Sequence, residues 1–93
     1  MHGEYKTPGG KLVAVDFTVA DGLLRQVRVS GDFFLYPEEA LATIDNALVG
    51  ASADEAPDQL AARIATALAP DVTMLGFSPE AVATAVRRGL EGA

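Results

Sequence analysis

The chain has 93 residues, of which 49% are hydrophobic and 22% charged, with a formal net charge of −6 and no cysteine. This composition predicts one folded domain, residues 1–93, and excludes general disorder, disulfides and thiolate chemistry. No run of about 18 apolar residues and no apolar signal core are present, so we expect neither a membrane span nor secretion, and place the chain in the cytoplasm. Because an acidic chain repels phosphates and anionic lipids, we expect no nucleic acid and no membrane surface as partner.

The first third of the sequence predicts three β-strands. Residues 2–6 form a short strand, which reaches the next one through Pro8-Gly9-Gly10. Residues 11–19 alternate as a half-buried strand does, and their apolar positions are Val13, Val15, Phe17 and Val19. Residues 23–30 form the third strand, after a turn at residues 20–22. Consecutive strands joined by such short turns predict an antiparallel sheet.

The length of the turn decides which residues face each other. A two-residue loop at Asp21 and Gly22 would place Val15 opposite the charged Arg28. A three-residue loop, with Gly22 in the left-handed region, pairs Val15 with Val27 and keeps the apolar faces together. We therefore predict the three-residue loop.

Residues 37–93 predict three amphipathic helices. The first begins at Pro37 and ends at Gly50, the second begins near residues 54–55 and ends before Pro70, and the third begins at Ser78-Pro79-Glu80. Their apolar stripes are Leu41, Ile44 and Leu48, then Leu60, Ile64 and Leu68, then Val82, Val86 and Leu90. Residues 72–77 form an apolar linker that we expect to be briefly extended. The predicted fold is α+β, with two layers: a three-stranded antiparallel sheet and three helices packed on one of its faces.

No catalytic constellation is visible in the sequence. His2 is the only histidine, and it lies at a terminus that we expect to fray. The acidic pairs at residues 38–39 and 54–55 stand at predicted helix starts, where the helix dipole favours them. Without clustered cysteine or histidine a metal site is not expected. We therefore predict no catalytic and no metal-ligating residue.

Two other segments are unusual. The turn at residues 7–11 combines a glycine-rich backbone with Lys11, which suits an anion, although an ordinary loop into a strand explains it too. Gly31 interrupts the alternation and predicts a bulge or a close backbone approach. Phe33 and Phe34 follow, and adjacent strand residues point to opposite faces. Either one of them faces outward as a contact surface, or both are covered.

The stretch EYKTPGGKLVAVDFTVADGLLRQVRVSGDFFLYPEEAL, residues 4–41, resembles the C-terminal accessory domain of lipoate–protein ligases. It is most similar to the version that occurs as a small separate protein beside a shorter catalytic protein. GFSPEAVATAVRRGL, residues 76–90, fits the final helix of that family, so the resemblance covers nearly the whole chain. The Pro-Gly-Gly-Lys-Leu turn and the Gly-Asp-Phe-Phe segment are its more specific parts.

The resemblance implies a function without catalysis by this chain. Such ligases activate lipoate with ATP to lipoyl-AMP and then transfer the lipoyl group to a lysine of an acceptor domain. In the split enzymes the accessory domain is needed for activation. ATP, Mg²⁺ and lipoate would then be bound by the assembled ligase, with no cofactor bound by this chain alone. The fold is similar to sulfur-acceptor and iron–sulfur scaffold proteins, which need the cysteine that this chain lacks.

The implied partners are the catalytic subunit of the ligase and, indirectly, lipoyl acceptor domains. The residues expected to contact substrate or partner are Gly9, Gly10, Lys11, Gly31, Asp32, Phe33 and Phe34. The chain would be either a natural small subunit or an excised domain of a longer ligase. A non-catalytic binding or scaffold module of another cofactor pathway is the alternative, and a self-sufficient enzyme is a third interpretation that no visible nucleophile, base or metal set supports.

Overall fold

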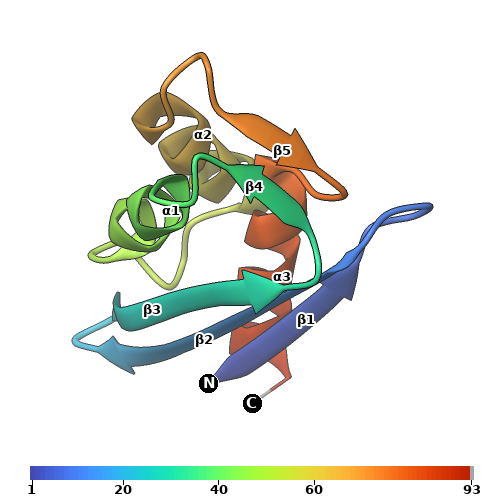
Figure 1. Cartoon of the computed structure of the whole chain (residues 1–93). Coiled ribbons are helices and arrows are strands. Elements are labelled where there is room, and N and C mark those ends of the chain that lie inside the picture. Colours follow the sequence, from blue (N-terminus) through green and yellow to red (C-terminus); the bar gives the residue numbers. More distant parts are fainter. Residues whose placement is uncertain (93) are drawn as a thin grey trace.

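A three-stranded antiparallel sheet forms one layer of the structure, a computed structural model that describes residues 1–92 (Figure 1). Its strands, in the order β1-β2-β3, are β1 (His2–Lys6), β2 (Leu12–Ala20) and β3 (Leu23–Gly31). The helices are α1 (Ala40–Leu48), α2 (Pro57–Ala67) and α3 (Pro79–Glu91). Helix α3 packs on β1 and β2, α1 packs on β3, and α2 packs against the other two helices. The predicted α+β fold, with its sheet and three helices, is confirmed.

A second, smaller sheet joins two short strands. Strand β4 (Phe34–Tyr36) follows β3, and β5 (Thr73–Leu75) precedes α3. They pair antiparallel, with Phe34 opposite Leu75 and Tyr36 opposite Thr73. The extended character of the linker at residues 72–77 was predicted, but its pairing with β4 was not.

The core lies between the main sheet and the helices, and the predicted stripes fill it. The fully buried large side chains are Val13, Val15, Leu24, Val29, Ile44, Leu48, Leu60, Ile64, Val82 and Val86. Leu41, Leu68 and Leu90 belong to the predicted stripes but are only partly buried at the margin of the core. No polar or charged residue among residues 1–92 is buried, so the core is held by apolar contacts.

The turn between β2 and β3 differs from the prediction. Ala20 pairs with Leu23, so the loop contains only Asp21 and Gly22, whose φ angles are 55° and 76°. Two successive positive φ angles are typical of the type I′ turn, whose twist matches that of the strands. The predicted three-residue loop is therefore wrong, although Gly22 is left-handed as expected.

A β-bulge on β3 restores the apolar pairing that a two-residue loop would disrupt. The register shifts between Asp16 and Thr18, and Gln26 on β3 has a φ of 53°. The additional residue places Val15 opposite Val29 and not opposite a charged side chain. The apolar face thus depends on the bulge and not on the length of the turn.

Helix α1 begins later than the sequence predicts. Residues 37–39 form a turn, in which the N–H of Ala40 donates to the carbonyl of Pro37 at 3.0 Å and the N–H of Leu41 to that of Glu38 at 3.1 Å. Both bonds span three residues, so the chain is wound more tightly there than in an α-helix. The two glutamates therefore precede the helix and do not form its first turn.

The other two helix starts show one correction and one confirmation. Helix α2 begins at Pro57, because the preceding loop runs along the hairpin, where the N–H of Ala53 donates to Gly22 O at 2.8 Å. Helix α3 begins where predicted, and the Ser78 hydroxyl accepts a hydrogen bond from the N–H of Ala81 at 3.1 Å. This bond satisfies one of the free donors at the helix start.

Helix α3 approaches β1 so closely that only glycine fits at two positions. A Cβ atom on Gly3 would collide with the carbonyl oxygen of Ala85, and one on Gly89 would lie 2.8 Å from Cε1 of Phe17. Beside this contact the Arg88 guanidinium lies over the ring of Tyr5, 4.9 Å from its centroid. The glycines therefore let the helix backbone rest on the strand.

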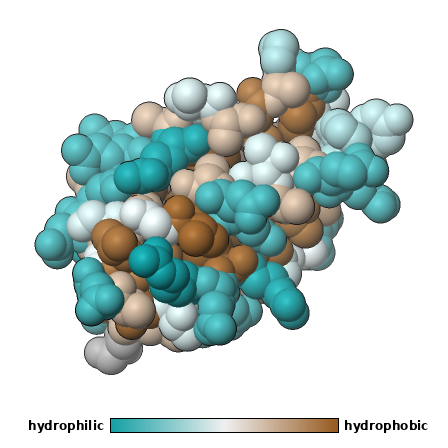
Figure 2. Space-filling view, turned by 90° about the vertical axis from the view of Figure 1, so that its left-hand side faces the viewer, coloured by the Kyte–Doolittle hydropathy of each residue, from teal (hydrophilic) through white to brown (hydrophobic). Residues whose placement is uncertain are grey.

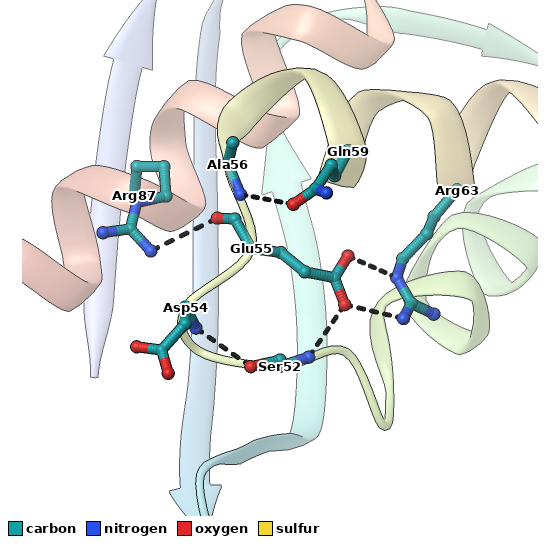
Figure 3. A network of polar contacts seen from close by, with 7 residues as sticks. All are labelled: Ser52, Asp54, Glu55, Ala56, Gln59, Arg63 and Arg87. Atoms are coloured by element: carbon teal, nitrogen blue, oxygen red, sulfur yellow. Dashed lines mark hydrogen bonds and ion pairs between the residues drawn. The ribbon is translucent and has the colours of Figure 1, made fainter.

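A polar network fastens the loop between α1 and α2, residues 49–56 (Figure 3). Glu55 binds Arg63 through two hydrogen bonds of 2.6 Å and also accepts the N–H of Ser52 at 3.0 Å. The pKa of Glu55 is lowered, chiefly by the hydrogen bonds from Arg63. From α3, Arg87 donates to the carbonyl of Ala53 at 2.6 Å. The loop that follows α1 is thus bound by side chains of both α2 and α3.

Candidate docking surface

The turn after β1 and the segment after β3 meet at one corner of the molecule. The N–H of Lys11 donates to the carbonyl of Gly76 at 2.9 Å, and the N–H of Leu12 donates to the Asp32 carboxylate, also at 2.9 Å. The structure therefore brings together the two segments that the sequence singles out. Gly76 also lies at this corner, although no local pattern in the sequence marks it.

Glycines permit this close meeting of backbones. A Cβ atom on Gly31 would collide with the carbonyl oxygen of Leu12, so of the two predicted alternatives, a bulge or a close backbone approach, the structure shows the close approach. A Cβ atom on Gly10 would lie 2.8 Å from the carbonyl oxygen of Gly76. Gly9 has open space around it and a φ of +69°, so it serves the turn and not the packing.

The two adjacent phenylalanines have different environments. The ring of Phe33 stacks on that of Phe77, with centroids 3.8 Å apart and an angle of 19° between the planes. Phe77 is buried, whereas Phe34 is 53% exposed. Of the two alternatives that the sequence leaves open, the structure therefore shows the one in which one phenylalanine packs inward and the other faces outward. Phe77 itself was not predicted, because its partner is distant in sequence.

An exposed apolar patch, defined by Phe34, Tyr36 and Leu75, covers the outer face of the β4–β5 sheet. Tyr36 and Leu75 are 63% and 58% exposed. Phe34 lies directly opposite Leu75, so their side chains share one face. The alternation of Phe34 and Tyr36 is a signal in the sequence, but in a strand of three residues it is too short to identify a face. Clustered exposed apolar side chains are typical of contact surfaces.

Another side of the molecule has, within residues 1–92, no comparable cluster of exposed apolar residues on two paired strands. Figure 2 presents the side that carries α1 and the turn between β2 and β3, where hydrophobic residues lie in small groups interrupted by hydrophilic ones. Apolar groups scattered in this way are normal on a protein surface. The apolar patch differs because its members are adjacent on two paired strands.

Lys11 lies next to this corner. A Cβ atom on Gly76 would be 2.6 Å from Cγ of Lys11, so the lysine stem passes over the glycine. Within residues 1–92, the ion pairs involve His2, Arg63 and Arg87 and leave Lys11 without a carboxylate. An exposed ammonium group held in this way is available to an anion.

An open groove of about 590 Å³ lies between β3, β4 and α1. It is continuous with the apolar patch, because Phe34 belongs to both. The residues that line it are Val29, Ser30, Gly31, Phe33, Phe34, Leu35, Glu38 and Leu41.

A further polar cluster surrounds His2, at the start of β1. His2 is not frayed: its Nδ1 lies 2.7 Å from the Asp16 carboxylate and its Nε2 lies 2.7 Å from that of Glu4. Hydrogen bonds to the Glu4 carboxylate and then to that of Asp16 raise the pKa of His2. The ring thereby connects β1 to Asp16 on β2.

Within the described part of the chain, no group of three His, Cys, Asp or Glu residues could hold a metal ion. No helix of residues 1–92 has the length and apolar character to cross a bilayer.

Comparison with known proteins identifies a likeness in fold. No protein-family model matches the sequence, and no curated protein matches it either. Among solved structures, the chain is similar to one from an archaeal lipoylation system of Thermoplasma acidophilum, which comprises a bi-partite lipoate protein ligase and its E2 lipoyl domain. The TM-score is 0.68 at 24% sequence identity, over 94% of this chain and 98% of the other. The two chains share a fold along almost their entire length.

Proposed function

We propose that the chain is the non-catalytic accessory subunit of a lipoate–protein ligase and acts with a separate catalytic subunit. The observation that carries the proposal is the corner where residues 9–11 and 31–34 meet beside the apolar patch. These are the segments in which the sequence resembles accessory domains of such ligases. The shared fold with a chain from a bi-partite ligase system supports the same assignment.

In this proposal the accessory subunit completes the site in which lipoyl-AMP forms. ATP, Mg²⁺ and lipoate bind to the assembled ligase, in the cytoplasm, and acceptor domains are lipoylated afterwards. An acyl adenylate hydrolyses readily, so covering the site protects the intermediate from water and orients the reactants. Lys11 supplies positive charge near the phosphates, while Phe34, with Tyr36 and Leu75, holds the catalytic subunit.

The deciding experiment measures lipoate-dependent release of pyrophosphate by the catalytic subunit, with and without this chain. We expect no release by this chain alone, little by the catalytic subunit alone, and a large increase when the two are mixed. If the catalytic subunit releases pyrophosphate equally well alone and never co-purifies with this protein, the proposal is wrong.

Two substitutions separate chemistry from assembly. Lys11→Ala should lower the rate of lipoyl-AMP formation in the complex without unfolding the domain, and Lys6→Ala, at another exposed lysine, is its control. Phe34→Ala should weaken assembly at least thirtyfold, since loss of an interface aromatic typically costs about 2–4 kcal/mol. Val49→Ala, at an exposed valine outside the patch, should leave the affinity unchanged.

A further inference from the structure

Strand β3 is an edge strand that is covered over only part of its length. Near its start, the N–H of Leu24 donates to the carbonyl of Ala51 at 2.8 Å, and the N–H of Gly50 donates to the carbonyl of Leu24 at 2.9 Å. The loop between α1 and α2 therefore pairs with this end of the edge. Such covering prevents the edge from pairing with another chain.

The opposite end of the same edge is covered at Val29 but not at Gly31. The N–H of Val29 donates to the Asp45 carboxylate on α1 at 2.8 Å, so the peptide groups of Val29 point away from β2. Because the direction of these groups alternates along an antiparallel strand, those of Gly31 also point away from β2. Gly31 is exposed, and its backbone borders the groove described above.

The groove beside this open edge has an apolar wall and one charged group. Phe33 and Leu41 are partly buried and pack against the core behind it, which holds the wall in place. Glu38 is the only ionisable side chain among the lining residues. An open strand edge next to an apolar groove suits an extended peptide, which gains affinity from main-chain hydrogen bonds and specificity from its side chains. The carboxylate favours a basic residue on that peptide.

We propose that this groove binds an extended segment of the catalytic subunit, which adds to the edge of β3 at Gly31. The segment places a large apolar side chain against Phe33 and Leu41 and a lysine or arginine beside Glu38. The inference rests on the proposed function and extends it, because it specifies how the partner is recognised. Phe34 belongs to both the groove and the apolar patch, so the groove and the patch form one continuous interface.

A matched pair of charge reversals tests the electrostatic part. Glu38→Lys and Glu39→Lys change the net charge equally and stand at adjacent exposed positions, but only Glu38 lines the groove. In titration calorimetry with the catalytic subunit, we expect Glu38→Lys to weaken binding about tenfold and Glu39→Lys to change it less than about twofold. Equal effects of the two variants would overturn the proposal.

Amide hydrogen exchange, followed by NMR with the unchanged chain, tests the strand addition. Exchange at the Gly31 amide should slow more than tenfold in the complex, whereas the Glu4 amide, on β1 at the far edge of the sheet, should keep its rate. Unchanged exchange at Gly31 would also overturn the inference. If no complex forms at all, both this inference and the proposed function fail. If a complex forms and Phe34→Ala weakens it while either of these tests is negative, only the inference fails.

Discussion

The stacked rings of Phe33 and Phe77, 3.8 Å apart at their centroids, join the segment that follows β3 to the segment that precedes α3. Each ring is adjacent to a residue of the proposed docking surface: Phe34 follows Phe33, and Gly76 precedes Phe77. The stack therefore fixes the inward side of the corner whose outward side carries the exposed aromatic. Stability and docking should accordingly be separable at neighbouring positions.

Substitution at the two adjacent phenylalanines should show this separation. Phe33→Ala removes a stacked and partly buried ring, and we expect the free energy of unfolding to fall by about 2–4 kcal/mol. Phe34→Ala removes a ring that is 53% exposed, so its effect should stay below about 1 kcal/mol. Urea unfolding followed by circular dichroism measures both. A larger loss for Phe34→Ala than for Phe33→Ala would contradict the assignment of their faces.

Two glycine substitutions should differ in cost because the glycines differ in role. Gly3→Ala pushes a methyl group into the carbonyl oxygen of Ala85, and we expect it to destabilise the domain by about 3 kcal/mol or more, since backbone on both sides must move. Gly9→Ala meets no atom within 4 Å and should cost only the 1–2 kcal/mol typical of a left-handed residue. Thermal unfolding compares them. Similar melting temperatures for the two variants would argue against the close contact of α3 with β1.

The bulge on β3 offers a stabilising change. Gln26 has a φ of 53°, which glycine adopts without steric cost, so Gln26→Gly should raise the free energy of unfolding by up to about 1 kcal/mol. Ser30→Gly, at an exposed position of the same strand with ordinary backbone, should instead lower it by about 0.5–1 kcal/mol. Chemical denaturation of both variants tests the prediction. Destabilisation by Gln26→Gly as large as that by Ser30→Gly would place the bulge elsewhere.

The ion pair of Glu55 and Arg63 predicts that the stability of the fold decreases as the pH falls. Because the hydrogen bonds from Arg63 lower the pKa of Glu55 below 4.5, the carboxylate stabilises the folded state above that pH. This contribution is lost as the pH falls through the lowered pKa. We therefore expect Glu55→Gln to reduce the loss of stability between pH 7 and pH 3 by about 0.5–1 kcal/mol, the size of a partly exposed pair. If the free energy of unfolding falls equally between pH 7 and pH 3 in Glu55→Gln and in the unchanged protein, the ion pair contributes nothing to stability.

Local patterns in the sequence predict most of the fold. The alternation of residues 11–19, the helical stripes and the cap at Ser78 each report interactions within a short stretch of chain. The predicted three-residue turn after β2 is wrong, because an unbroken register would need it and nothing about Gln26 marks it as the bulged residue. A bulge changes the pairing without changing the apolar pattern, so the pattern alone cannot reveal it.

The residues of the proposed docking surface were predictable only in part, for a related reason. Gly31 and the phenylalanine pair interrupt a local pattern and could be recognised. Gly76 and Phe77 take part only because the chain returns to the corner after two helices, and Leu75 becomes exposed beside Phe34 through the same pairing. Asp32 acts through its bond to the N–H of Leu12, twenty residues earlier. Contacts of this range depend on the tertiary structure and leave no periodic signal.

The fit of α3 against β1 and β2 governs when the domain can form during synthesis. The helix, residues 79–91, leaves the ribosome after the other described elements, yet it covers the face of the sheet that carries Phe17. Until then the three strands have only part of their apolar face protected, since α1 packs on β3 alone among them. Contacts between distant parts of a chain slow folding, and exposed strands favour aggregation. The domain therefore folds completely only after residues 79–91 have left the ribosome, and truncation before residue 79 should yield a sheet prone to self-association.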